Sequence, residues 1–175
     1  MSAAGPEIHI FTGPVDAGKT GKLKEYLRSS LARGLSVAGV LSEALMRDGR
    51  KEAYMAVDIK DGERFLLVSR EKLDSEEATG SFHFSDEGFR RASEVILRGV
   101  GSDMLVIDEL GPQELKGKGF GPVLREVLRK YAGTLVLVIR RPLLDELMTF
   151  YGLKDRVVEI TDCSLSEPVS FEPWS

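Results

Sequence analysis

The chain has 175 residues, of which 42% are hydrophobic and 30% are charged. This composition is typical of one packed domain and is too apolar for a disordered chain. The 24 basic and 28 acidic side chains leave a net charge of −4, which disfavours a nucleic-acid-binding protein. A single cysteine, Cys163, excludes an intrachain disulfide and a zinc site built from several cysteines.

Membrane and secretion signals are not found in the sequence. No segment approaches the roughly 20 apolar residues that cross a bilayer, and the first residues, Met1 to Glu7, lack the pattern of a secretion signal. We therefore expect a single cytoplasmic domain over residues 1–175 that binds neither nucleic acid nor a membrane. The sequence identifies no protein partner.

Strand-like and helix-like patterns alternate along the chain. Strands are predicted at Glu7–Thr12, Ser36–Leu41, Met104–Asp108, Thr134–Ile139 and Val157–Ile160. Helices are predicted at Lys19–Ala32, Asp86–Arg98, Pro122–Tyr131 and Pro142–Tyr151. Continuous apolar strands are typical of a parallel sheet that is covered on both faces. The order indicates a three-layer α/β domain with a mostly parallel sheet and helices on both faces.

Two further apolar runs interrupt this alternation. They are Tyr54–Ile59 and Arg64–Val68, and they flank Asp61-Gly62, which predicts an antiparallel hairpin insertion at about residues 54–69. The glycine-rich stretch from Gly111 to Gly121 is expected to be a loop. The tail, at about residues 163–175, is expected to be irregular.

Residues 13–20, Gly-Pro-Val-Asp-Ala-Gly-Lys-Thr, match the pattern of a phosphate-binding loop. They follow a predicted strand and open a predicted helix, so backbone N–H groups can converge on a phosphate there. We expect Lys19 to reach the β and γ phosphates and Thr20 to offer its hydroxyl to Mg²⁺. Asp16 is either a turn former or has a role toward the ligand. The expected nucleotide-binding residues are Gly13, Pro14, Val15, Asp16, Ala17, Gly18, Lys19, Thr20 and Gly21.

A pair of carboxylates, Asp108 and Glu109, follows a buried strand, at the edge where a doubly wound sheet presents groups to its ligand. We expect Asp108 to hold Mg²⁺ together with Thr20. Glu109 is placed to orient and deprotonate a water for in-line attack on the γ phosphate. The fold is therefore predicted to be that of a P-loop nucleoside triphosphatase.

These residues resemble a known family. The phosphate-binding loop, the segment Asp108-Glu109-Leu110-Gly111 followed by Glu114 and Phe120, and the segments 37–40 and 47–54 are similar to the P-loop nucleoside-triphosphatase family described from thermophiles and animals, the cancer-related nucleoside-triphosphatase-like proteins. The resemblance spans most of residues 7–161. It implies a cytosolic enzyme that slowly hydrolyses ATP, GTP and other nucleoside triphosphates with Mg²⁺, through Lys19, Thr20, Asp108 and Glu109.

Two positions depart from the family pattern. The family usually has glycine where Asp16 stands and a second threonine where Gly21 stands. The match is loose over residues 49–54, so the resemblance assigns no base-contacting role to Tyr54.

Hydrolysis by this route usually needs another positive charge on the transferred phosphoryl group. Arg140 and Arg141 end a predicted strand at the same sheet edge as Asp108 and are the first catalytic candidates. Further candidates are Lys116, Lys118, Arg47 and Arg50.

Two other functions stay open. A P-loop kinase would use Glu109 to deprotonate the hydroxyl of a small acceptor such as a nucleoside, although Cys163 alone cannot build the zinc site common in thymidine kinases. A slow nucleotide-binding switch is the other alternative. The chain has no asparagine, which excludes the guanine-reading Asn-Lys-x-Asp motif of Ras-type switches.

Overall fold

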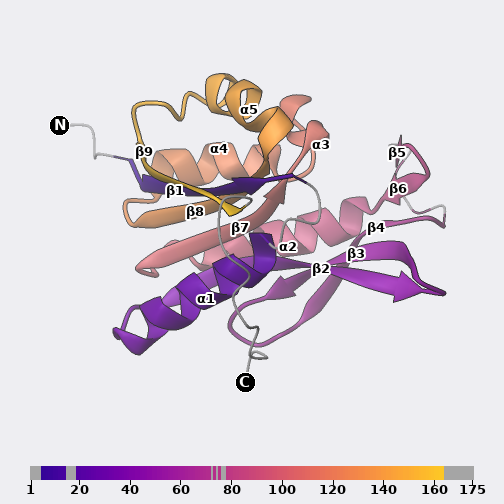
Figure 1. Cartoon of the computed structure of the whole chain (residues 1–175), viewed down its shortest axis with the longest axis horizontal. Helices are drawn as coiled ribbons and strands as arrows, with labels where there is room; N and C mark the ends of the chain where they lie inside the picture. The colour runs from indigo at the N-terminus through magenta and orange to yellow at the C-terminus, as the bar shows by residue number, and fades with distance from the viewer. Residues whose placement is uncertain (1–4, 15–18, 72, 74, 76–77, 164–175) are drawn as a thin grey trace.

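The computed structural model describes residues 5–14, 19–71, 73, 75 and 78–163. In this part of the chain one mixed sheet forms the middle layer, with the strand order β5-β6-β4-β3-β2-β7-β8-β1-β9 (Figure 1). The strands are β1 (Glu7–Gly13), β2 (Val37–Arg47), β3 (Arg50–Asp58), β4 (Arg64–Ser69), β5 (Ala78–Thr79), β6 (Phe82–Phe84), β7 (Met104–Leu110), β8 (Thr134–Arg140) and β9 (Val157–Asp162). The helices are α1 (Lys19–Ala32), α2 (Asp86–Arg98), α3 (Pro112–Leu115), α4 (Gly121–Lys130), η1 (Arg141–Leu143) and α5 (Leu144–Phe150). Most of the predicted irregular tail, residues 164–175, lies outside the described residues.

The strands β2, β7, β8, β1 and β9 pair in parallel, as the long apolar runs predicted. Strand β8 lies between β1 and β7. The carboxyl ends of β1 and β7 therefore meet at the same edge of the sheet, about 10 Å apart at the usual strand spacing. This topology brings the described start of the loop after β1 to the same sheet edge as the carboxylates at the end of β7.

Helices cover both faces of this sheet, as predicted, but unequally (Figure 1). One face carries α1, whose Leu23 and Leu27 pack with Phe11, Val106 and Val138. The other face carries α2, α4 and α5, whose apolar stripes form a larger buried cluster with alternate residues of the same strands. The buried strands are apolar on both sides because both of their faces are covered.

The antiparallel part of the sheet is larger than the sequence predicted. Strands β3 and β4 form the expected hairpin around Asp61-Gly62. However, β3 begins at Arg50 rather than Tyr54, and β2 continues to Arg47 rather than ending at Leu41. A second hairpin joins β2 to β3 through Asp48 and Gly49, both with positive φ. The sequence pattern is weak here because cross-strand pairing, and not burial on one face, holds the outer half of β2.

Four short elements also differ from the predictions. The stretch Gly111–Gly121, expected to be a loop, contains α3, which starts at Pro112. Strands β5 and β6 were not predicted, since two and three residues are too few for a periodic signal. The helix expected from Pro142 to Tyr151 begins as the 3-10 turn η1 and becomes α-helical at Leu144.

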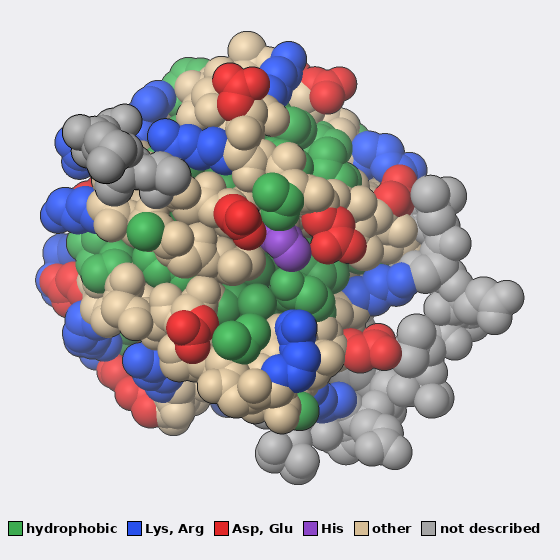
Figure 2. Space-filling model, turned by 90° about the vertical axis from the view of Figure 1, so that its left-hand side faces the viewer, with side chains coloured by type: hydrophobic (Ala, Val, Ile, Leu, Met, Phe, Trp, Pro, Cys, Tyr) green, Lys and Arg blue, Asp and Glu red, His purple; other side chains and the backbone are tan. Residues whose placement is uncertain are grey.

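Acidic and basic side chains are mixed over the surface, as Figure 2 shows for the side that lies to the left in Figure 1. On that side the described acidic and basic side chains are interspersed. Among the described residues, no helix is long and apolar enough to cross a membrane.

Candidate functional site

The predicted phosphate-binding loop connects the end of β1 to the start of α1. Gly13 is the last residue of β1 and Lys19 the first of α1; Val15, Asp16, Ala17 and Gly18 lie outside the described residues. The Lys19 side chain is 8% exposed, and its Nζ donates a hydrogen bond of 2.9 Å to the backbone oxygen of Pro14. The Lys19 ammonium group is thus hydrogen-bonded to the residue at which the first described part of the loop ends.

The next two residues of α1, Thr20 and Gly21, have different surroundings. The Thr20 hydroxyl donates to Oδ2 of Asp108 at 3.4 Å, which joins the first turn of α1 to the end of β7. At Gly21 an added Cβ would meet no atom within 4 Å. The helix therefore has room for a side chain where this sequence has glycine.

Asp108 is fully buried near the end of β7. Its Oδ2 accepts a 3.0 Å hydrogen bond from the backbone N–H of Ser42 in addition to the Thr20 contact. Its Oδ1 is buried and has no hydrogen-bond partner among the described atoms. Burial raises the pKa of Asp108 to about 7, although the Ser42 hydrogen bond acts in the opposite direction. A buried carboxylate oxygen without a partner is the kind of group that a divalent cation satisfies.

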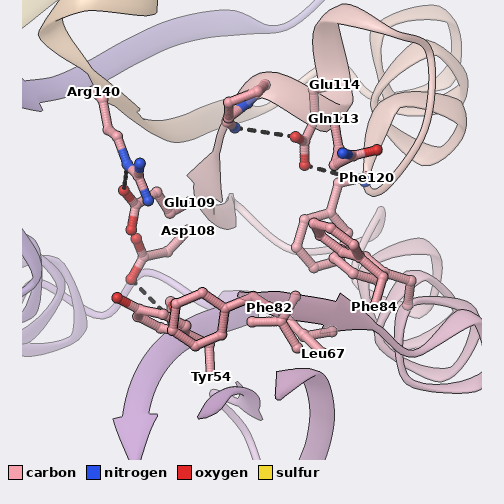
Figure 3. A pocket seen from close by; sticks show the side chains of 15 residues that line it. Tyr54, Leu67, Phe82, Phe84, Asp108, Glu109, Gln113, Glu114, Phe120 and Arg140 are labelled. Atoms are coloured by element: carbon pink, nitrogen blue, oxygen red, sulfur yellow. Dashed lines mark hydrogen bonds and ion pairs between the residues drawn. The ribbon is translucent and has the colours of Figure 1, made fainter. Parts of the chain in front are cut away.

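Glu109, the next residue, is paired with a cation from the neighbouring strand. Nε of Arg140, at the end of β8, donates to Oε1 of Glu109 at 2.9 Å (Figure 3). The two side chains are 25% and 39% exposed for Glu109 and Arg140, respectively. Both groups therefore keep access to solvent while they lie beside the buried Asp108.

The other basic candidates lie elsewhere. Arg141 forms an ion pair with Asp162, at the end of β9, so the structure pairs Arg140, and not Arg141, with Glu109. Lys116 and Lys118 follow α3, and Lys118 lines a groove between α2 and α4. Arg47 and Arg50 pair across the tip of the β2–β3 hairpin.

Glu114 organises the chain that follows Glu109. Its carboxylate accepts hydrogen bonds from the backbone N–H groups of Gly111 (3.0 Å) and Phe120 (3.3 Å), and the Tyr151 hydroxyl donates to its backbone oxygen. Burial raises the pKa of Glu114 to about 7. A signal for this role is present in the sequence, because proline at the first helical position followed by glutamate at the third is typical of a helix start.

An aromatic-lined cavity beside Glu109 escaped the sequence analysis. Tyr54, Phe82, Phe84, Phe89 and Phe120 contribute rings to it, together with Leu67 and Val68 (Figure 3). These residues come from β3, β4, β6, α2 and the segment before α4. These residues come together only through tertiary packing, so no local sequence pattern predicts the cavity.

The residues present fit a magnesium ion bound with a nucleotide. No group of three or more His, Cys, Asp or Glu side chains is placed to hold a metal in the part of the chain that the structure describes. Mg²⁺ usually takes only one or two protein ligands and completes its shell with water and substrate phosphates. Thr20 and Asp108, 3.4 Å apart, match that sparse requirement.

The chain is similar to known nucleoside triphosphatases in sequence and in fold. Residues 8–164 match the family model described as NTPase. The proteins named nucleoside-triphosphatase THEP1 from Ignicoccus hospitalis and Thermococcus kodakarensis are 33% and 31% identical to this chain; the matches cover 77% of this chain in both cases, and 76% and 77% of the relatives. The protein of the same name from Methanopyrus kandleri is 28% identical, over 78% of this chain and 75% of its own length.

A solved structure has the same fold. The solution structure of a human cancer-related nucleoside triphosphatase superposes with a TM-score of 0.69 and covers 89% of this chain and 88% of its own, at 22% identity. The phosphate-binding loop between β1 and α1, the strand order and the family match over most of the chain agree with one another. The chain therefore belongs to the NTPase family of P-loop hydrolases.

Proposed function

We propose that the chain hydrolyses nucleoside triphosphates to the diphosphate and phosphate, with Mg²⁺, and that Glu109 accepts a proton from the attacking water. One observation carries this proposal: the Thr20 hydroxyl lies 3.4 Å from Asp108, with Glu109 next in the chain. The residue that follows the predicted phosphate-binding loop motif's lysine is thus in contact with the first of the two carboxylates. That arrangement supports in-line attack on a γ phosphate held at the loop.

Thr20 and Asp108 would hold the magnesium ion. When bound, Mg²⁺ neutralises charge on the β and γ phosphate oxygens. The unpartnered Oδ1 of Asp108 supports this assignment. The described protein ligands are a hydroxyl and a carboxylate, which are the oxygen donors that Mg²⁺ prefers.

Lys19 and Arg140 have separate proposed roles toward the phosphates. Lys19 brings a buried ammonium to the β and γ phosphates in place of its contact with Pro14. Arg140 stabilises negative charge on the transferred phosphoryl group. Because Arg140 also binds Glu109 at 2.9 Å, it orients that carboxylate toward the attacking water. The other proposed nucleotide contacts come from backbone N–H groups of residues 13–18 and from Gly21.

Replacement of Glu109 tests the proposal. Glu109→Gln keeps the size of the side chain and its hydrogen bond but removes the base, so phosphate release from Mg·ATP should fall at least about 100-fold. The dissociation constant for ATP, measured by calorimetry, should stay within about threefold, because Glu109 acts on the nucleophile and not on the bound phosphates. Glu94→Gln, at an exposed position on α2, is the matched control and should change neither value.

A rate in Glu109→Gln equal to that of the parent would remove Glu109 from the mechanism. If the protein is instead a nucleotide switch, the parent protein itself would bind ATP but hydrolyse it at a negligible rate. Phosphate release from four different triphosphates, with and without Mg²⁺, separates these cases and measures the base preference.

A further inference from the structure

A cavity of about 160 Å³ lies beside Glu109 and has one strongly aromatic wall. Tyr54 and Phe82 lie together with their ring centres 5.8 Å apart, and Phe89 bridges Phe84 (6.0 Å) and Phe120 (5.0 Å). In Figure 3 the labelled rings of Tyr54, Phe82, Phe84 and Phe120 border the same open space as Asp108 and Glu109. Aromatic rings that line a cavity can bind flat unsaturated rings by stacking, at about 1–3 kcal/mol for a nucleobase, and one face of the Phe82 ring is already covered by the Arg70 guanidinium, 4.6 Å from the ring centre.

Arg140 is the one basic side chain among the described residues that line the cavity, and the acidic side chains in the lining are Asp108, Glu109 and Glu114. The Arg140 guanidinium is already paired with Glu109. A phosphate in the cavity would therefore meet no unpaired cation among the described lining residues, and burial of an unpaired anion is costly. The cavity therefore suits an uncharged ligand.

The size of the cavity limits the ligand further. Sites for drug-sized molecules usually measure about 300–1,000 Å³, and this cavity is about half the lower figure. It has room for one flat ring, with any attached group in the open mouth. An uncharged nucleoside with a single-ring base meets these conditions.

The cavity also lies where the nucleophile of the proposed reaction would approach. The described loop residues Gly13, Pro14, Lys19 and Thr20 are absent from its lining, whereas Asp108 and Glu109 form part of it. In-line displacement requires the nucleophile to approach the γ phosphorus opposite the leaving oxygen. Because Glu109 is the group that takes the proton of the nucleophile, a ligand beside Glu109 lies on the nucleophile's side.

We propose that this cavity is an acceptor site for a pyrimidine nucleoside; this inference rests on the proposed function, because it uses the same base and phosphate donor. A hydroxyl oxygen of the nucleoside forms a bond to the γ phosphorus of the triphosphate. The bond from that phosphorus to the oxygen bridging the β phosphorus breaks, and the nucleoside diphosphate leaves. The hydroxyl proton passes to the Glu109 carboxylate. With the cavity empty, water takes the place of the hydroxyl and the reaction is hydrolysis.

Uridine is the probe for this site. The full chain is incubated with Mg·ATP and uridine, and uridine monophosphate, ADP and phosphate are quantified by chromatography. Direct binding of uridine is measured by saturation-transfer NMR. We expect saturable uridine binding and uridine monophosphate as a product. Uridine monophosphate itself should bind at least about tenfold more weakly, because the lining offers its phosphate no unpaired cation.

Variants of the aromatic wall connect the result to the cavity. Phe82→Ala removes a stacking ring, and Phe82→Leu removes the ring but keeps an apolar side chain in case the alanine variant does not fold. In each, the ratio of uridine monophosphate to ADP formed should fall at least about fivefold, the equivalent of about 1 kcal/mol of stacking. Phe150→Ala is the matched control: Phe150 is 42% exposed on α5 and is absent from the cavity lining. In Phe150→Ala the ratio of uridine monophosphate to ADP should equal that of the parent.

The outcomes separate this inference from the proposed hydrolysis. Phosphate release from ATP without uridine monophosphate formation, or uridine phosphorylation that Phe82→Leu leaves unchanged, overturns the acceptor site and leaves hydrolysis intact. Absence of both products from a protein that binds ATP would instead contradict the proposed function.

Discussion

Two buried carboxyl groups, Asp108 and Glu114, lie on either side of Glu109 in the sequence and line the same cavity. Burial raises the pKa of each to about 7. Both already accept backbone hydrogen bonds that favour the charged form, so desolvation is the larger effect. Glu114 is 3% exposed, and its position fixes Gly111 and Phe120 around α3.

Glu114 should make the free energy of unfolding depend on pH. Its pKa is higher in the folded protein than in the unfolded chain, so the folded state binds more protons between about pH 4.5 and pH 7. Stability from this group is therefore present at low pH and lost as the pH rises through 7. Asp108 acts in the same direction, so the test is the difference between Glu114→Gln and the parent.

The amide of Glu114→Gln does not ionise. The stability of this variant relative to the parent should therefore rise by about 1–3 kcal/mol between about pH 5 and pH 8, as measured by urea unfolding. Glu126→Gln, a half-buried position on α4 paired with Lys130, is the comparison. A constant difference between Glu114→Gln and the parent at all pH values would show that Glu114 has an ordinary pKa.

The two neighbouring arginines at the end of β8 should differ in catalysis. Arg140 contacts Glu109 and Arg141 contacts Asp162. Arg140→Ala should lower kcat for phosphate release about 100-fold, the usual effect of removing one group that stabilises developing charge. Arg141→Ala should lower it by less than about threefold. Steady-state kinetics on both variants measures the two effects. A larger loss of kcat in Arg141→Ala than in Arg140→Ala would assign the catalytic charge to Arg141.

At the scale of elements, β2 is the point where the parallel sheet becomes antiparallel. It pairs with β7 over residues 37–40 and with β3 over residues 40–47. Gly39 in this strand has φ +111°, and a Cβ built there would lie 2.1 Å from the backbone oxygen of Val106. The close approach of β2 to β7 at this position therefore requires glycine.

Gly39→Ala should destabilise the protein by at least about 2 kcal/mol, since it adds backbone strain and a clash between strands. Gly101→Ala is the matched control, because a Cβ there would meet no atom within 4 Å. Urea unfolding of both variants measures the difference. Equal stability of the two would mean that β2 can move away from β7 at little cost.

At the scale of the whole molecule, the described ends of the predicted phosphate-binding loop, the two carboxylates and the aromatic cavity all lie at one edge of the sheet. The loop belongs to the β1–α1 side and the cavity to the antiparallel extension, with Asp108 and Glu109 between them. Binding of Mg·ATP should therefore stabilise the whole fold, because both halves of the sheet contribute to the bound state.

The Glu109→Gln variant permits this measurement without turnover. With Mg·ATP at about 100 times its dissociation constant, stability should rise by about 2.7 kcal/mol, which corresponds to a Tm increase of roughly 5–10 °C for a chain of this length. Removal of Mg²⁺ by EDTA should abolish most of the shift. Adding Lys19→Ala should do the same, and a full shift in that double variant would place the nucleotide elsewhere.

The sequence by itself determined much of the local structure. The bounds of α1 and α2 agree with the prediction from apolar periodicity and end signals such as Ser85, whose hydroxyl accepts from the N–H of Gly88. The phosphate-binding loop and the carboxylate pair follow from short contiguous motifs. Periodicity and motifs encode these features because neighbouring residues supply the interactions that form them. The domain limits and the cytoplasmic location stay predictions.

Tertiary structure alone decided how these pieces meet. The insertion of β8 between β1 and β7, the choice of Arg140 over Arg141 as the partner of Glu109, and the gathering of five aromatic rings into one cavity all depend on contacts between distant segments. The outer half of β2 was missed for the same reason, since its hydrogen bonds come from β3. The free energy of such contacts comes from pairs of segments that are distant in the sequence. No local sequence pattern therefore predicts them.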